Sequence, residues 1–161
     1  MKYTLTLPGK PVAKERPNFA QNDARVHPVR AHAYTPDKTR AAEAVLREAF
    51  CWQNPRHRPM AGPVGMTVIF YMPIPKKLKK ADRLLAEAEQ LWHTKRPDGD
   101  NLMKLAKDAL NGLAFLDDSQ ICKENDIKLY SPNPRTVIVI ESLEGVNPRT
   151  VIEFESLEGN L

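Results

Sequence analysis

The chain has 161 residues, 42% of them hydrophobic and 27% charged, and this composition predicts one globular domain with its own core. The net charge is only +4, but residues 1–58 hold eleven Lys and Arg against five Asp and Glu, whereas residues 133–161 hold two against five. This asymmetry fits a surface facing a polyanion, and it fits an unevenly charged, solvated surface equally well. No stretch resembles a signal peptide or a membrane span, so we expect a cytoplasmic protein without a membrane partner.

The first half of the chain predicts two strands and one helix. A strand over 3–7 is ended by Pro8-Gly9, and residues 8–37, rich in Pro and basic residues without apolar periodicity, predict a long basic loop. Thr35-Pro36 opens a helix over 38–53. Prolines then separate this helix from a strand over 64–72.

The second half predicts two helices and two further strands. A helix over 78–91 would bury Leu84, Leu85, Ala88 and Leu91, and a helix over 101–111 would end at the cap Asn111-Gly112. Strands follow over 121–130 and 135–142. The fold class that this order indicates is α/β (α+β), a single small domain with a mixed sheet packed against helices.

The C-terminus contains a near-duplication, because NPRTVIVIESLEG at 133–145 recurs as NPRTVIEFESLEG at 147–159. The first copy is apolar on both faces, as a covered strand requires, whereas the second alternates apolar residues with Glu. We therefore expect a domain over 1–145, with the first copy inside the sheet. Residues 146–161 would form an edge strand or a tail on which function does not depend.

Residues 96–121 are the most informative segment, because they gather four carboxylates, with cations close by, around one short amphipathic stretch: Asp98, Asp100, Asp117 and Asp118. Carboxylates held together are costly unless something neutralises them, and a hard divalent cation is the usual answer. Metal-dependent phosphate chemistry is therefore the first hypothesis.

Each member of this group also has a purely structural interpretation. If the chain over 97–100 is extended, Asp98 and Asp100 face one side, and Asp100 stands at or near a helix N-cap, where many Asp residues have no catalytic role. Lys104, one turn on, is either half of a weak surface ion pair or a cation that stabilises charge on a phosphate. Asp117 and Asp118 are adjacent at the entry to a strand, so only one of them can face the first pair.

The series RPDGDNL at 96–102, Lys104, DALNG at 108–112 and DDSQI at 117–121 closely resembles the RusA-type Holliday junction resolvases, which are small dimeric endodeoxyribonucleases common in phages and prophages. The resemblance covers residues 95–128, including Lys128. A looser likeness, at 9–17 and 34–36, matches the basic loop of the longer members. The duplicated C-terminal strand departs from the family's pattern.

This resemblance implies a crossover junction endodeoxyribonuclease, a hydrolase that resolves four-way DNA junctions by paired symmetric nicks during recombination and repair. Asp98, Asp100 and Asp118 would bind Mg²⁺, for which Mn²⁺ can substitute, and Lys104 would stabilise negative charge in the transition state. A homodimer in a bacterial or phage-infected cell would present two equivalent sites to the two-fold symmetric junction. The candidates for contacts to DNA phosphates are Lys10, Lys14, Arg16, Lys95 and Arg96.

Two other interpretations stay open at this point. A non-catalytic junction-binding protein could use the basic loop alone, although carboxylates facing phosphate bring a pure binder no advantage. A nucleotide-sugar transferase with a DxD motif is disfavoured by the chain's size, by its basic balance and by the lack of a nucleotide-binding βαβ pattern.

Overall fold

The computed structural model describes residues 1–16, 18–20 and 32–147. A four-stranded sheet lies at its centre, in the order β1 (Lys2–Pro8), β6 (Arg135–Ser142), β4 (Val64–Pro73) and β5 (Ile121–Ser131). Strand β6 pairs antiparallel with both β1 and β4, whereas β5 pairs parallel with β4. The predicted small α+β domain with a mixed sheet is thereby confirmed.

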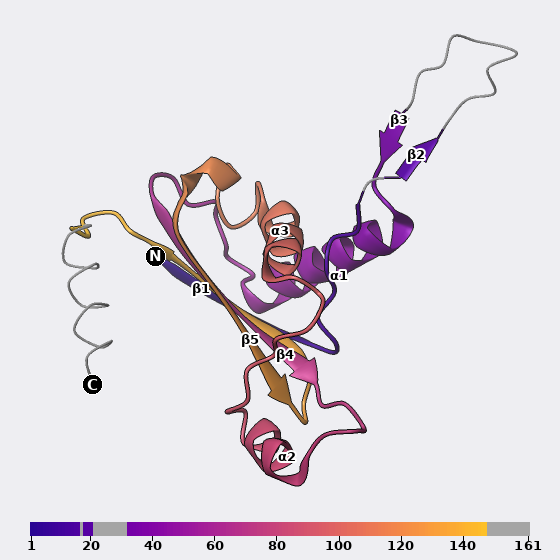
Figure 1. The fold of residues 1–161 in the computed structure, drawn as a ribbon. Helices are drawn as coiled ribbons and strands as arrows, with labels where there is room; N and C mark the ends of the chain where they lie inside the picture. The colour runs from indigo at the N-terminus through magenta and orange to yellow at the C-terminus, as the bar shows by residue number, and fades with distance from the viewer. Residues whose placement is uncertain (17, 21–31, 148–161) are drawn as a thin grey trace, which may run out of the picture.

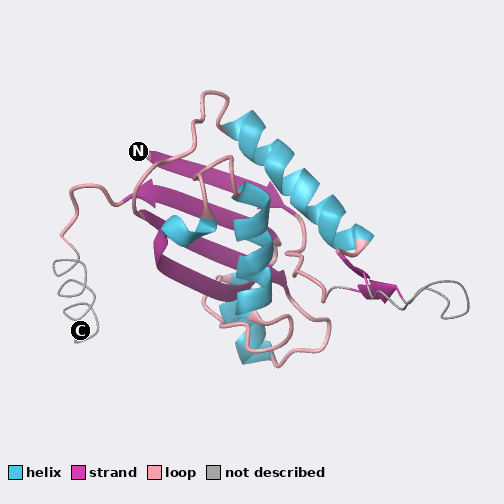
Figure 2. Ribbon diagram, turned by 90° about the horizontal axis from the view of Figure 1, so that it is seen from above, coloured by secondary structure: helices cyan, strands magenta, loops and turns pink. Residues whose placement is uncertain are grey.

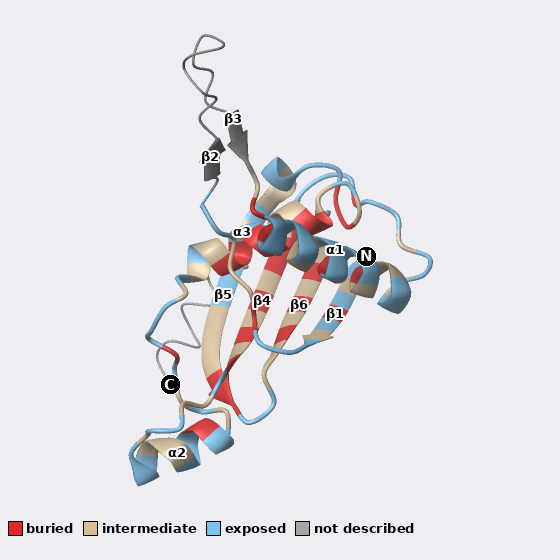
Figure 3. Ribbon diagram, turned by 90° about the vertical axis from the view of Figure 1, so that its right-hand side faces the viewer, coloured by how far each residue is buried: buried red, intermediate tan, exposed pale blue. Residues whose placement is uncertain are grey.

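Helices α1 (Asp37–Gln53) and α3 (Gly99–Leu110) lie across one face of this sheet (Figures 1 and 2). The strands alternate accordingly: Met66, Val68 and Phe70 of β4 are buried beneath the helices, while Thr67 and Ile69 between them are only half-buried. Figure 3 shows the buried positions gathered where the helices cover β4 and β6. The core therefore lies on one side of the sheet, and α3 is fixed to it by its apolar residues.

Helix α2 (Lys80–Glu87) is shorter than predicted and turns a different face inward. Leu84 and Leu85, expected in the core, are 62% and 43% exposed, and the buried residue is Ala86. Ala88 is also exposed, and only Leu91, which follows the helix, packs against the core. The helix lies beyond the end of the sheet (Figure 1), so it has little apolar surface to cover.

The predicted loop over 8–37 contains regular structure near both of its described ends. Strands β2 (Asn18–Ala20) and β3 (His32–Tyr34) pair antiparallel and extend away from the sheet (Figure 1). Residues 9–16 instead run back along α3, where the backbone N–H of Lys14 donates to the carbonyl of Asn101 at 3.0 Å. Residues 17 and 21–31 lie outside the described part of the chain.

The first copy of the C-terminal duplication forms β6, which lies between β1 and β4 inside the sheet, as predicted. The second copy falls almost wholly on residues 148–161, outside the described residues, so the proposed division at residue 145 stays a prediction. Within the described ranges, no helix has the length and apolar character needed to cross a membrane.

Candidate active site at the N-terminus of helix α3

The start of α3 holds the first two candidate carboxylates. Asp98 occupies the N-cap position, with an extended backbone (φ −72°, ψ 147°), and its side chain makes no capping hydrogen bond. Asp100 lies in the first helical turn, near the N-cap as expected, but the chain is not extended through residue 100, because the helix begins at Gly99. Both carboxylates are exposed. The positive end of the helix dipole favours negative charge at this place.

The segment leading into α3 is held by the neighbouring strand. Lys128 of β5 donates hydrogen bonds from Nζ to the carbonyl oxygens of Lys95 (3.0 Å) and Pro97 (2.8 Å). The backbone N–H of His93 donates in turn to the Lys128 carbonyl at 2.9 Å. Because these bonds fix the backbone on both sides of Arg96, they determine where Asp98 enters the helix.

A third carboxylate, which the sequence reasoning did not include, lies at the same helix end. Asp126 of β5 reaches the backbone of Gly99, where a Cβ atom, if one were present, would lie 2.1 Å from Asp126 Oδ2. Asp126 is on the same face of β5 as Lys128, since side chains two apart along a strand share a face. Two features of the sequence could have indicated this contact: the two-residue spacing of Asp126 and Lys128 in the strand, and the glycine between Asp98 and Asp100.

Asp117 and Asp118 have different roles around the short 3₁₀ helix η1 (Asp118–Gln120). Asp117 caps this turn, because its Oδ1 accepts from the N–H of Ser119 at 3.0 Å while Gln120 Oε1 accepts from the N–H of Asp117 at 2.9 Å. The hydrogen bonds from Ser119 lower the pKa of Asp117. Asp117 has an extended backbone, but Asp118 begins the 3₁₀ turn and β5 starts only at Ile121, so the two residues do not stand directly at the entry to the strand as predicted. Asp118 is exposed and takes no part in this cap.

The turn η1 lies at the other end of α3 from Asp98 and Asp100. Gln120 anchors it by donating to the carbonyls of Met60 (3.2 Å) and Gly62 (2.8 Å), and β5 then runs back toward Gly99. At about 3.3 Å per residue, the start of β5 is some 16 Å from Asp126. Within one chain the structure thus brings Asp98 and Asp100 together and leaves Asp118 apart. No three His, Cys, Asp or Glu side chains of the described residues are close enough to hold a metal ion.

The basic residues predicted to contact DNA lie around α3, but they differ in how exposed they are and in whether their charge is already paired. Lys104 is exposed one turn after Asp100, and Lys10, Lys95 and Arg96 are exposed too. Lys14 is half-buried and forms an ion pair with Asp108 on α3, so its charge is already matched within the protein. Arg16 is exposed next to residue 17, where the described stretch ends. The basic segment lies beside the lead-in to α3, since Lys10, Lys14 and Pro97 line one shallow depression.

His93 lies behind this cationic region and is only 8% exposed. Its ring stands 4.8 Å from that of Tyr130, and its Nδ1 is buried without a hydrogen-bond partner in the described structure. Burial lowers the pKa of His93, and the positive charges of Lys128 and Lys95 lower it further. The environment of His93 therefore disfavours the protonated form of its imidazole.

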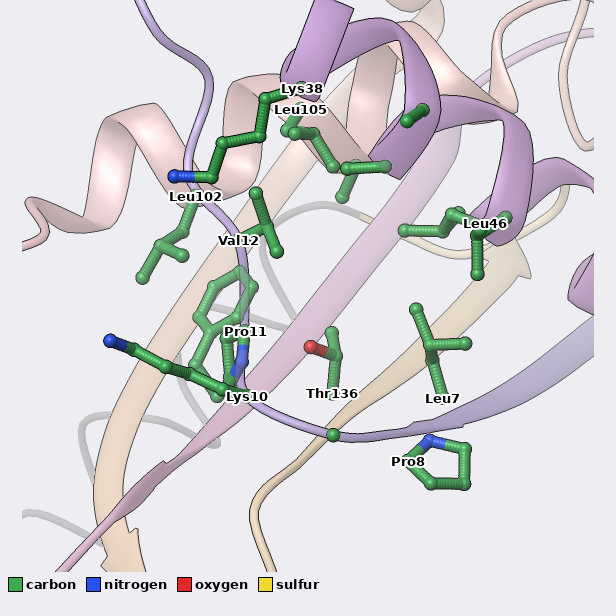
Figure 4. Close-up of a pocket in the computed structure, with 16 residues that line it drawn as sticks. Leu7, Pro8, Lys10, Pro11, Val12, Lys38, Leu46, Leu102, Leu105 and Thr136 are labelled. Atoms are coloured by element: carbon green, nitrogen blue, oxygen red, sulfur yellow. The ribbon is translucent and has the colours of Figure 1, made fainter.

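An apolar pocket of about 310 Å³ opens on another side of α3, between the end of β1, the following loop and α1 (Figure 4). Leu46, Leu102 and Leu105 are among its lining residues, while Lys10 and Lys38 stand at its edge with their ammonium groups pointing out on the same side. None of the residues that line the pocket is acidic. It is consequently separate from the carboxylates and lacks the ligands that a hard cation needs.

Comparison with known proteins agrees with the arrangement around α3. A protein-family model described as Endodeoxyribonuclease RusA matches residues 8–141, which include the basic segment, α3, β4, β5 and all of β6 but its last residue, whereas only the last residue of β1 falls within the match. The chain belongs to the RusA endodeoxyribonuclease family. It is also 33% identical over 144 residues to a Bacillus subtilis (strain 168) relative, YqaN, an uncharacterized protein; the alignment covers 86% of this chain and 95% of the relative.

Proposed function

We propose that the protein is a Mg²⁺-dependent, structure-selective endodeoxyribonuclease that resolves four-way DNA junctions by paired symmetric nicks. The observation that carries the proposal is the pair Asp98 and Asp100 at the N-terminus of α3, exposed and flanked by cations, in a chain of the RusA endodeoxyribonuclease family. Carboxylates next to a polyanion repel it unless a cation lies between them. The site is therefore suited to hold a metal ion against a DNA phosphate.

The residues at this helix end fit a hard divalent cation, with Mn²⁺ as a substitute for Mg²⁺. Mg²⁺ prefers oxygen ligands and usually keeps several waters, using one or two protein carboxylates together with substrate phosphates. A pair of exposed carboxylates with solvent around it matches that requirement without a closed set of ligands. The missing Cβ of Gly99 leaves room for the carboxylate of Asp126, which lies against this glycine.

A bound divalent ion would supply Lewis acidity and a more acidic water for hydrolysis of the phosphodiester. The chain's own residues do the rest. Lys104 extends from the helix face that also carries Asp100, and its ammonium group would stabilise the negative charge that develops on the phosphate. Lys128 keeps Asp98 in place through the carbonyls of Lys95 and Pro97. Lys10, Lys95 and Arg96 would bind neighbouring phosphates.

We further propose a homodimer in which Asp118 acts at the metal site of the second copy. Asp118 is the free member of the Asp117–Asp118 pair, but in its own chain it lies at the far end of α3. A two-fold symmetric dimer can bring this end of one chain to the opposite end of α3 in its partner, and it does so twice. Two composite sites would then face the two strands of the junction that must be cut.

The experiment that tests the proposed function uses a synthetic four-way junction with each strand labelled in turn. The expected result is a pair of nicks at symmetric positions that requires Mg²⁺ or Mn²⁺ and is stopped by EDTA, with linear duplex of the same sequence cut far less. Binding of the junction without any cut in the presence of either metal would refute the proposal and favour the non-catalytic junction-binding protein.

A further inference from the structure

We propose that the apolar pocket between the end of β1, the following loop and α1 binds one unstacked base of the DNA strand that lies along the N-terminal end of α3. The inference rests on the proposed function and adds to it a subsite for a single nucleotide near the branch point. The free volume of the pocket, about 310 Å³, is at the small end of the range for ligand sites in proteins.

The lining of the pocket favours a ligand with apolar faces. Phe70, Leu102 and Leu105 contribute to it, and each of them belongs to the buried core. Apolar surface that meets water costs free energy, and a ligand of the same character removes that cost. Thr136 is the one uncharged polar side chain of the lining, and its hydroxyl can donate or accept a hydrogen bond. A nucleobase, with two apolar faces and a polar edge, matches this combination.

The charges at the mouth of the pocket match the phosphates on either side of such a base. Lys10 and Lys38 stand there with their ammonium groups on the same side (Figure 4), and none of the lining residues is acidic. Lys38 pairs with Glu15 at 3.1 Å, but both side chains are exposed, so the pair is weak and a phosphate can replace it. A purely apolar ligand would leave both cations unused, whereas a bound nucleotide places its phosphates beside them.

The pocket is also continuous with the surface proposed to bind the cleaved strand. The shallow depression that reaches Pro97, the residue before Asp98, shares Lys10 and Lys38 with the pocket. Leu102, in the pocket wall, is four residues after Asp98, about 6 Å along the axis of α3. A strand with a phosphate at the start of α3 can therefore place a nearby base in the pocket. Extruding that base costs least where pairing and stacking are already disturbed, and a branch point interrupts the stack.

The test follows junction binding without turnover. All proteins in it carry Asp100→Asn, which the proposed function expects to bind a four-way junction without cutting it. Ala41→Phe places a ring in the pocket from an exposed position on α1, and Val45→Phe repeats the change at a second exposed position of the lining. Ala44→Phe, which is exposed on the same helix but outside the lining, is the matched control.

The fluorescent base 2-aminopurine, placed at one position at a time around the branch point, reports the unstacking. We expect one position on each cut strand to brighten when the parent protein or Ala44→Phe binds, because the base leaves the stack, and to stay dark with Ala41→Phe and Val45→Phe. The two pocket variants should keep the Tm of the parent and bind the junction about fivefold more weakly. This factor is at the lower end of the range for one stacked base, since the cost of unstacking offsets part of the gain.

The outcomes separate this inference from the proposed function. If no position brightens, or if the same position brightens equally with Ala41→Phe, the pocket holds no base and the inference is overturned, while paired nicks by the wild type would still support the nuclease. A pocket that takes a segment of another protein or of a second copy would give that same result. A wild type that brightens the base but cuts no junction overturns the nuclease and leaves the pocket inference standing. Failure to bind the junction at all overturns both.

Discussion

Nζ of Lys128 lies 2.8 Å from the carbonyl oxygen of Pro97, and this bond joins the edge strand of the sheet to the residue just before Asp98. A charged donor on β5 thereby fixes the backbone that carries the first candidate carboxylate. Lys128, although it lies on a strand, can therefore influence the position of Asp98 at the start of a helix.

Replacement of Lys128 by Met should reduce both stability and nicking. Hydrogen bonds from charged groups contribute about 1.5–3 kcal/mol when buried, and Lys128 is only half-buried, so we expect a loss of about 1–2 kcal/mol in the free energy of unfolding. Urea unfolding measures this change in stability. The rate of junction cleavage at saturating Mg²⁺ measures how much activity is lost when Asp98 is no longer held in position. Lys77→Met, on an exposed lysine remote from α3 in sequence, serves as the control. Unchanged cleavage by Lys128→Met would contradict the positioning role.

Glu89 should make the fold sensitive to acid. Hydrogen bonds from Arg135 and Ser131 lower the pKa of Glu89, and Arg135 itself lies over the Tyr71 ring, 3.5 Å from its centroid. Since the folded pKa is lower than the unfolded one, the stabilisation is full above the unfolded value, about 4.3, and is lost as pH falls through the folded value.

Glu89→Gln should therefore be less stable than the wild type at pH 7, by about 1 kcal/mol because the pair is partly exposed, and the difference should shrink toward pH 3. Chemical unfolding at several pH values measures it. Glu87→Gln, whose carboxylate is 4.0 Å from Arg83 on the exposed side of α2, should show almost no such change. A difference between wild type and Glu89→Gln that stays constant with pH would contradict this account.

His93 should give a second pH dependence. It is a base and Glu89 is an acid, but in both cases stability falls as the pH falls. Its pKa is lowered in the folded state by burial and by Lys128 and Lys95, so below about 6.5 the unfolded chain takes up a proton first. Stability is then full above that pH and declines as the pH falls toward the folded value. His93→Phe keeps an aromatic ring beside Tyr130 and removes the unpaired buried Nδ1.

We expect His93→Phe to be at least as stable as the wild type at pH 7 and to lose less stability between pH 7 and pH 5. Thermal unfolding across this range is the measurement. A variant with the same pH slope as the wild type would show that His93 does not titrate in this way.

Much of the fold follows from the sequence because the segments that form it are locally consistent. The predicted strand over 135–142 coincides with β6, which is paired on both edges, although only one of its two apolar faces is buried, because the helices cover one side of the sheet. Helix α1 begins directly after Pro36, within one residue of the predicted start at 38. For α2 the apolar spacing of Leu84 and Leu85 was misleading, because a helix beyond the sheet has little core to face.

The candidate site was only partly predictable from sequence. Asp98 and Asp100 are neighbours in the chain, so their proximity needs only the local turn into α3. The placement of Asp118 and Asp126 depends on how β5 runs against α3, which is a tertiary relationship. Asp126, 27 residues from Gly99, reaches the helix end, whereas Asp118 does not, and no spacing in the motif distinguishes the two outcomes.

Complementation tests the composite arrangement proposed for the dimer. Asp100→Asn and Asp118→Asn should each be inactive alone. In a mixed dimer, one composite site carries both changes and the other carries neither, so nicking should reappear at one strand per junction. Co-refolding the two variants and scoring single-strand nicks measures this. Absence of any recovered activity would contradict a site built from Asp98 and Asp100 of one chain and Asp118 of the other.

The salt dependence of junction binding should distinguish the basic residues that contact DNA phosphates from those that do not. Each phosphate contact contributes about 0.9 to the slope of log K against log salt on duplex DNA. Lys10→Gln, Lys95→Gln and Arg96→Gln should each lower the slope by about that amount, while Lys14→Gln should change it less, because Lys14 is paired with Asp108. Equal slopes for wild type and all four variants would contradict the predicted DNA-facing surface.

The most direct measurement of the central claim compares wild type and Asp100→Asn on one synthetic four-way junction with Mg²⁺, with binding and cutting followed in the same samples. The account predicts that Asp100→Asn binds the junction as the wild type does and produces no nicks. Normal cutting by Asp100→Asn would contradict the assignment of this carboxylate to the metal site.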